Sequence, residues 1–188
     1  MSNTPLKEVA GFMAAHSLVL ATAESCTAGL IAAHLAEVPG AGELLESACI
    51  TYSPDAKQQR LGVKPETIAR FNLTSEQVAG EMAQGVLRNS QANLAIANTG
   101  VTDDTDPAIP AGTQCFAWLF AGRNGQAAEM FTETRRFTGE RNEIREQAAR
   151  HALSKIPVYY AALSGKVAPA KEPANNLRNL RAQAVGSS

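Results

Sequence analysis

The stretch "AESCTAG" holds Ser25, Cys26 and Thr27 where an apolar run gives way to a helical pattern. The free N–H groups at the start of a helix carry about half a positive charge, which favours a negative atom placed there. If the hydroxyl of Ser25 attacks a carbonyl carbon, the oxyanion could lie against the N–H of Cys26 or Thr27. The same position suits a plain helix cap, so the residues alone leave both interpretations open.

A serine nucleophile needs a base, and Lys57 is the candidate. The three histidines, His16, His34 and His151, lie within helical patterns that do not aim them at the serine. A lysine accepts a proton only when its pKa falls from about 10.4, through burial or a nearby positive potential. A helix start beside the serine would supply that potential, so one feature would favour both an oxyanion and a neutral lysine.

The segment "ITYSPDAKQQRLGV" places Lys57 just after a predicted strand that could lie beside the strand leading to Ser25. Tyr52 ends that predicted strand. Its phenol could relay a proton between serine and lysine, or donate to the oxyanion. Without further information, a lysine on a short helix is usually solvated and a tyrosine at a strand end usually packs against its neighbours.

Cys26 is a rival nucleophile, because a thiol is intrinsically more reactive than a hydroxyl. Adjacent residues on a helix point about 100° apart, so only one of Ser25 and Cys26 can face a pocket. The pairing of a serine with a lysine favours Ser25.

Two arginines near the start of the last predicted helix could bind an anion. Arg141 and Arg145 stand four residues apart, so they share a helix face and could hold a phosphate with help from the helix N-terminus. The alternative is pairing with neighbouring acids, for which the sequence offers Glu140, Glu143 and Glu146.

Three acids follow the third predicted strand, in "NTGVTDDTDPAIPAGT". Asp103, Asp104 and Asp106 supply the oxygen ligands that calcium and magnesium prefer, but the spacing lacks the full calcium-loop pattern and its distant glutamate. We therefore expect a solvated acidic turn and no metal site.

The elements that must position these residues alternate between strands and helices. The predicted strands are 17–23, 47–53, 93–100, 112–122 and 127–137, and the predicted helices are 7–16, 25–38, 54–62, 73–90 and 139–156. The last two strands, joined by "GRNGQ", are typical of a hairpin. We expect one α/β domain over residues 1–164, with a mixed sheet in a three-layer α/β/α arrangement.

Composition excludes several classes of protein. With 17 Lys+Arg against 18 Asp+Glu in 188 residues, the chain has no broad basic field for nucleic acid. It has no apolar run of about 20 residues and no secretory-signal pattern, so we expect a cytoplasmic protein with no membrane or nucleic-acid partner. The three cysteines, Cys26, Cys49 and Cys115, lack the CxxC spacing of zinc sites and do not indicate a disulfide framework.

The chain changes character at about residue 165. The segment "GKVAPAKEPANNLRNLRAQAVGSS" has little apolar content, two prolines, and four basic residues against one acid. We expect residues 165–188 to form a flexible or loosely docked basic tail.

The motifs "TAESCTAGLIAAHLAEVPGAGELLES" and "ITYSPDAKQQRLGV" closely resemble the carboxy-terminal domain of the CinA family, the nicotinamide-nucleotide amidases. The segments "TSEQVAGEMAQGVLRNSQANLAIANTG" and "FTGERNEIREQAARHAL" resemble further family motifs, so the similarity runs from about Leu6 to Tyr160. The resemblance implies a CinA C-terminal-domain-like fold.

The resemblance also implies an activity. Family members hydrolyse the carboxamide of nicotinamide mononucleotide to nicotinate mononucleotide and ammonia, feeding NAD salvage, without a cofactor or metal, and they commonly form homo-oligomers. It gives Ser25 the nucleophile role, Lys57 the base role and Tyr52 a supporting role. The expected substrate contacts are Cys26, Thr27, Gly29, Thr99, Gly100, Arg141 and Arg145.

The chain departs from the family pattern at three places. Ala28 replaces a glycine of SCTGG, and Pro54 replaces the asparagine of YSN. The acids of "TGVTDDTDPAIP" replace a glycine-rich TGIAGPxGG loop, and their negative charges would repel a substrate phosphate. Two other hypotheses therefore stand beside the amidase: a divergent paralogue that binds or senses nucleotides, and a hydrolase of a different small amide.

Overall fold

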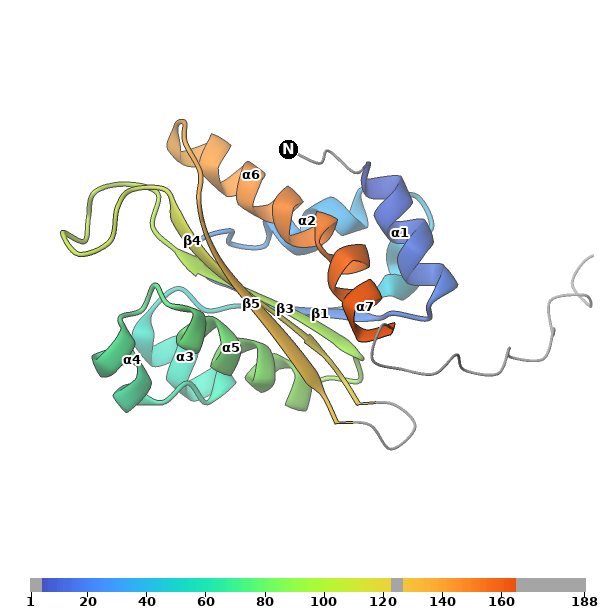
Figure 1. Ribbon diagram of the computed structural model, residues 1–188, viewed down its shortest axis with the longest axis horizontal. Coiled ribbons are helices and arrows are strands. Elements are labelled where there is room, and N and C mark those ends of the chain that lie inside the picture. Colours follow the sequence, from blue (N-terminus) through green and yellow to red (C-terminus); the bar gives the residue numbers. More distant parts are fainter. Residues whose placement is uncertain (1–4, 123–126, 165–188) are drawn as a thin grey trace, which may run out of the picture.

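The apolar runs of the sequence form one five-stranded sheet in the computed structural model, which describes residues 5–122 and 127–164 (Figure 1). The sheet order is β2-β1-β3-β4-β5. The strands are β1 Leu20–Glu24, β2 Leu45–Ile50, β3 Leu94–Gly100, β4 Thr113–Phe120 and β5 Glu129–Arg136. β1 pairs in parallel with β2 and β3, whereas β4 runs antiparallel to both β3 and β5. The mixed sheet is confirmed.

Helices cover both faces of this sheet, which confirms the three-layer arrangement (Figure 1). One layer consists of α1 Leu6–Ala15, α2 Leu30–Ala36, α6 Arg141–Ser154 and α7 Ile156–Ser164. The other consists of α3 Pro54–Leu61, α4 Pro65–Phe71 and α5 Glu76–Arg88, and a short 3-10 helix spans Ala41–Leu44. Large side chains such as Trp118 and Phe116 face the first layer, while alanines face α5.

Most predicted elements match observed ones. The hairpin of β4 and β5 forms as expected, and its connection includes residues 123–126, which lie outside the described residues. The expected tail, 165–188, also lies outside them. Two α-helices were not predicted: α4 is short and buries no residue fully, and α7 begins at Ile156, the last residue of the predicted helix 139–156, and continues beyond it.

The helix that follows β1 begins at Leu30, so the prediction that it starts at Ser25 was wrong. The intervening residues form a turn in which Ala28 and Gly29 have positive φ values of 48° and 96°. Left-handed backbone is costly for alanine and free for glycine, and two such residues in succession cannot continue a right-handed helix.

The N–H groups at the start of α2 are bound by the fully buried carboxylate of Glu24. Its oxygens accept hydrogen bonds from the amides of Gly29, Ile31 and Ala32 at 2.8, 3.1 and 3.1 Å. Thr22 donates its hydroxyl to the same carboxylate at 2.9 Å. The positive end of α2 is therefore already neutralised from within the fold and does not serve an oxyanion or depress the pKa of a lysine.

Strand order places a crevice at the carboxyl end of β1. From β1 the chain crosses through α2 to β2 on one side, and then through α3, α4 and α5 to β3 on the other side of β1. The two crossovers lie on opposite faces of the sheet (Figure 1). In open α/β sheets, ligands bind at such a reversal of strand order, outside the carboxyl ends of the strands.

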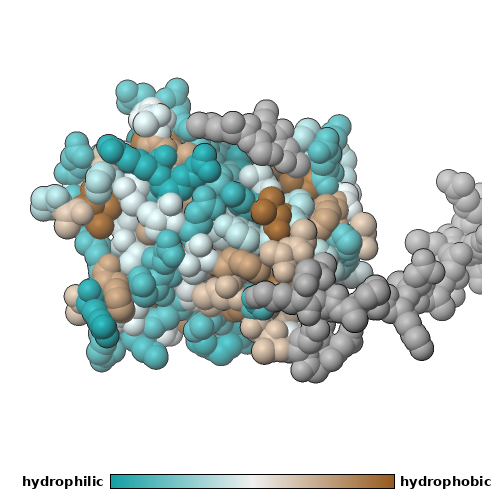
Figure 2. All heavy atoms as spheres, in the orientation of Figure 1, coloured by the Kyte–Doolittle hydropathy of each residue, from teal (hydrophilic) through white to brown (hydrophobic). Residues whose placement is uncertain are grey.

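The described residues contain no helix long and apolar enough to cross a bilayer. Hydrophilic residues cover most of the face seen in Figure 2, and hydrophobic ones gather there in small groups.

Glu24→Gln is expected to lower the free energy of unfolding by about 2 kcal/mol, because the new amide NH₂ faces backbone donors that need an acceptor. Urea titration measures the change. Glu66→Gln, on the exposed first turn of α4, removes the same charge and should stay within about 0.5 kcal/mol of the wild type. Equal stability of the two variants would contradict the role given to Glu24.

Gly85→Ala is expected to cost about 1 to 3 kcal/mol, because its new Cβ would stand 2.0 Å from the carbonyl oxygen of Leu61 at the end of α3. Gly11→Ala is the matched control: it is also helical, has nothing within 4 Å of its Cβ position, and should gain up to about 1 kcal/mol. Thermal unfolding of both variants checks the prediction, which fails if Gly85→Ala melts at or above the wild-type temperature.

Candidate active site

Backbone hydrogen bonds tie together the ends of three parallel strands. The N–H of Thr51, after β2, donates to the carbonyl of Glu24 at 2.8 Å, and the N–H of Ser25 donates to the carbonyl of Asn98 in β3 at 3.0 Å. Ser25 therefore lies at the centre of the sheet's carboxyl edge, between the chains that leave β2 and β3.

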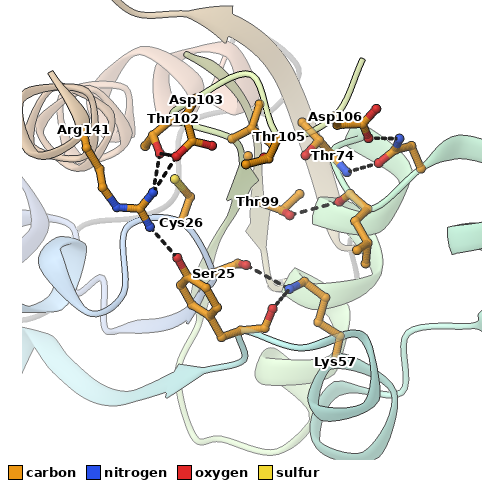
Figure 3. A pocket seen from close by; sticks show the side chains of 15 residues that line it. Ser25, Cys26, Lys57, Thr74, Thr99, Thr102, Asp103, Thr105, Asp106 and Arg141 are labelled. Atoms are coloured by element: carbon orange, nitrogen blue, oxygen red, sulfur yellow. Dashed lines mark hydrogen bonds and ion pairs between the residues drawn. The ribbon is translucent and has the colours of Figure 1, made fainter. Parts of the chain in front are cut away.

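The structure brings Lys57 directly to Ser25, with its Nζ 2.9 Å from the serine Oγ (Figure 3). The start of α3 fixes this approach: Pro54 occupies the first turn, and the Ser53 hydroxyl caps the helix by accepting the N–H of Ala56 at 3.1 Å. Lys57 sits in that first turn, so its side chain can reach back toward the end of β2.

Burial tunes Lys57 for a proton-accepting role. Its side chain is only 1% exposed, and this burial lowers its pKa to about 8. Nζ donates to the carbonyls of Thr51 at 2.8 Å and Tyr52 at 3.3 Å. Those two bonds use two N–H groups, so in the neutral amine the lone pair is left for the Ser25 hydroxyl proton.

One backbone donor beside the nucleophile is open. In the turn after β1, the amides of Thr27, Ala28 and Gly29 donate to Asn98 Oδ1, the Ser25 carbonyl and Glu24, respectively. Within the described part of the chain, the amide of Cys26 has no acceptor. It is therefore the candidate backbone donor to an oxyanion in this turn.

The Cys26 thiol is placed differently from the Ser25 hydroxyl. Gln114 Nε2 lies 3.2 Å from its Sγ, and burial raises the pKa of the thiol. A buried thiol with a raised pKa is a poor nucleophile, whereas Ser25 has the lysine beside it. The geometry favours Ser25.

Tyr52 lies at the exposed rim of the site. Its backbone carbonyl accepts from Lys57, but its phenol, 60% exposed, accepts a hydrogen bond from Arg141 Nη2 at 3.0 Å. Within the described residues, the phenol makes no hydrogen bond to Ser25 or Lys57. The structure thus brings Tyr52 to the pocket without placing its phenol in a proton relay.

The guanidinium of Arg141 has three partners. Besides Tyr52, its Nη1 donates to the Thr102 hydroxyl at 2.8 Å and to the Asp103 carboxylate at 3.0 Å (Figure 3). The acidic loop therefore folds onto the arginine at the pocket rim.

Arg145 binds the backbone of the turn after β1 and a side chain of α6. Its Nε donates to the carbonyl of Cys26 at 3.0 Å, its Nη2 to that of Thr27 at 3.3 Å, and its Nη1 to the side chain of Asn142 at 3.1 Å. Arg145 holds the turn that carries the nucleophile. Among the described residues, neither it nor Arg141 pairs with the glutamates of α6.

Ser25 and Lys57 border a cavity of about 380 Å³. Of the expected site residues, its lining contains Ser25, Cys26, Tyr52, Lys57, Thr99, Gly100 and Arg141. Thr27, Gly29 and Arg145 lie outside the lining and act through the backbone of the turn. The lining also contains Asn72, Leu73, Thr74, Val101, Thr102, Asp103, Thr105 and Asp106, which sequence reasoning did not name as substrate contacts.

Two buried amides behind the nucleophile were also missed. Asn98 accepts the N–H of Thr27 at 3.1 Å and donates to Gln114 Oε1 at 3.0 Å, and Gln114 donates to the carbonyl of Val101 at 3.0 Å. Both are fully buried. A side-chain amide within each largely apolar run, "LAIANTG" and "TQCFAWLF", was the available signal, since a buried amide needs a partner.

The acids of the loop differ in their contacts. Asp106 accepts from the Asn72 side chain at 2.7 Å and the Ala108 N–H at 2.9 Å, and the bond from Asn72 holds the pKa of Asp106 below its usual value. Asp104 is exposed and outside the cavity lining. No group of three or more His, Cys, Asp or Glu side chains within 5–122 and 127–164 is arranged to hold a metal ion.

The histidines lie away from the nucleophile. His34 Nε2 is 2.6 Å from Glu146, and His151 Nε2 is 3.1 Å from Glu133. None of the three histidines lines the cavity.

Comparisons with known proteins agree with this architecture. Residues 3–159 match the CinA C-terminal domain. A CinA-like protein of Chlorobium limicola is 38% identical over 169 residues, which are 88% of this chain and 39% of that protein. A CinA-like protein of Mycobacterium tuberculosis is 41% identical over 147 residues, 73% of this chain and 33% of that protein. The chain therefore spans well under half the length of these curated relatives.

Solved structures share the fold over most of their length. The crystal structure of competence damage-inducible protein A from Klebsiella pneumoniae has a TM-score of 0.76 at 30% identity, covering 84% of this chain and 98% of that one. The competence/damage inducible protein from Agrobacterium tumefaciens has a TM-score of 0.72 at 33% identity, covering 85% and 99%. With its sequence matched from residue 3 to 159 and its fold shared, this chain belongs to the CinA family through the carboxy-terminal domain of that family.

Proposed function

We propose that this protein is an amidase that hydrolyses the carboxamide of a pyridine nucleotide or a closely related compound through an acyl-enzyme. The observation that carries the proposal is the 2.9 Å contact between Lys57 Nζ and Ser25 Oγ, buried at the floor of a cavity. Family membership and the resemblance to nicotinamide-nucleotide amidases support nicotinamide mononucleotide as the first substrate to test.

The reaction follows from the contacts of the dyad. Ser25 Oγ attacks the carboxamide carbon while its proton passes to the lone pair of neutral Lys57. The resulting oxyanion lies near the amide of Cys26. The protonated lysine then returns the proton to the leaving nitrogen, which departs as ammonia. Water attacks the acyl-enzyme, Lys57 takes its proton, and the serine oxygen leaves with that proton as the acid is released.

The contact of Asp103 with Arg141 favours a second candidate function. In this alternative, a paralogue that has lost amidase activity keeps the fold and the dyad and binds a nucleotide as a regulatory module. The two functions differ in turnover, which one assay measures.

Release of ammonia from nicotinamide mononucleotide, or from its nucleoside, is expected with the wild-type protein. It should fall at least about 10³-fold in Ser25→Ala and Lys57→Ala, because each variant removes one partner of the proton transfer. Cys26→Ala keeps the dyad and the backbone amide, and should retain most of the activity. Activity lost in Cys26→Ala but kept in Ser25→Ala would overturn the mechanism. Binding without turnover in the wild type would favour the regulatory module.

Activity is expected to rise with pH through the pKa of Lys57, about 8, and then level off. The base must be neutral, and burial places its deprotonation near pH 8 rather than above 10, so kcat/KM should increase about tenfold per pH unit on the acidic side. The measurement is kcat/KM from pH 6 to 9.5. A profile that is flat over this range, or that falls with pH, would exclude Lys57 as the base.

A further inference from the structure

Both arginines that could receive a substrate phosphate are occupied. Arg141 is bound by Tyr52, Thr102 and the carboxylate of Asp103, and Arg145 is bound by the backbone carbonyls of the nucleophile turn. An incoming phosphate that approaches the Nη1 side of Arg141 would meet the carboxylate of Asp103, which lies 3.0 Å from that nitrogen (Figure 3). In this arrangement the protein supplies its own anion at the pocket rim.

The charges that line the cavity are unfavourable to a further anion. The lining holds two acids, Asp103 and Asp106, and two bases, Lys57 and Arg141. Above about pH 8 the amine of Lys57 is neutral, which leaves one positive charge, on Arg141, against two negative ones. Hydrogen bonds from Asn72 and the Ala108 amide keep Asp106 in its ionised form.

The remaining polar lining suits uncharged hydroxyl groups. Thr74, Thr99, Thr102 and Thr105 all border the cavity (Figure 3). Threonine hydroxyls both donate and accept, and so match the hydroxyls of a sugar without calling for charge. The hydroxyl of Thr99 is oriented by the carbonyl of Leu73 at 3.0 Å.

We propose that the pocket selects a cationic amide that carries no phosphate, a pyridinium carboxamide nucleoside rather than its nucleotide, and that Asp103 sets this preference. The inference rests on the proposed amidase function and narrows its substrate class. The pyridinium charge is attracted by the acids of the rim, while a phosphate meets the carboxylate of Asp103 in place of a free arginine.

The first test compares kcat/KM of the wild-type protein for nicotinamide riboside, nicotinamide mononucleotide and uncharged nicotinamide. The riboside is expected to exceed the mononucleotide by about tenfold, because the phosphate charges face Asp103 and Asp106. It should also exceed nicotinamide, which lacks the cationic ring and the sugar. A mononucleotide preferred over the riboside would overturn the inference, since Asp103 would then yield to phosphate.

Two variants test whether Asp103 sets the preference for the riboside. Asp103→Asn removes the negative charge beside Arg141 and leaves the guanidinium with uncharged partners only, so the ratio of mononucleotide to riboside kcat/KM should rise about fivefold or more. Asp104→Asn is the matched control: it removes the same charge from the neighbouring residue, which is exposed and outside the lining, and should leave the ratio nearly unchanged. Equal shifts in both variants would contradict a specific role for Asp103.

A binding measurement separates this inference from the proposed function. Calorimetric titration of Ser25→Ala with riboside and with mononucleotide reports affinity without turnover. If the wild type releases no ammonia but Ser25→Ala binds the riboside more tightly, the amidase proposal fails and the selectivity stands. If the mononucleotide binds as tightly or more tightly, or if neither compound binds, the selectivity fails, whatever the activity of the wild type.

Discussion

The burial of one amine governs the arrangement of this site. Lys57 lies among the ends of β2, α3 and β1, where water cannot solvate an ammonium, so its hydrogen bonds must come from the fold. The carbonyls of Thr51 and Tyr52 and the hydroxyl of Ser25 provide them. The close approach of α5 at Gly85 keeps α3 against the sheet edge, and with it the lysine. The proton affinity of the amine is thus a property of how the ends of two strands, β1 and β2, pack with two helices, α3 and α5.

The positive N-terminus of α2, the helix after β1, is bound by a carboxylate of the fold and does not serve the reaction. The buried carboxylate of Glu24 takes the N–H groups of the first turn of α2 and so fixes where that helix begins. The nucleophile then sits in a turn rather than on the helix. As a result, the stabilisation of an oxyanion falls to the turn itself, and the lowered pKa of the lysine comes from desolvation rather than from a helix dipole.

The sequence was sufficient to predict the sheet, the layers and the pairing of Ser25 with Lys57, because apolar runs and motif spacing report on local structure and strand ends. It did not reveal the helix start at Leu30, since "SCTAGLIAAHL" has an unbroken helical pattern and the carboxylate that ends the turn precedes it. Nor did it place Arg141 against Asp103, because that contact depends on how a loop after β3 folds over the start of α6. Contacts between distant loops carry no periodic signal in a sequence.

The hydrogen bonds from Arg145 to the turn that bears the nucleophile join residues that are far apart in the chain. The carbonyls of Cys26 and Thr27 are bound from 119 and 118 positions further along. During synthesis Ser25, Lys57 and the first three strands therefore emerge well before Arg145, which binds the turn after β1. A nascent chain lacking α6 holds the reactive groups without this constraint, so the order of translation delays completion of the site until nearly the whole domain has left the ribosome.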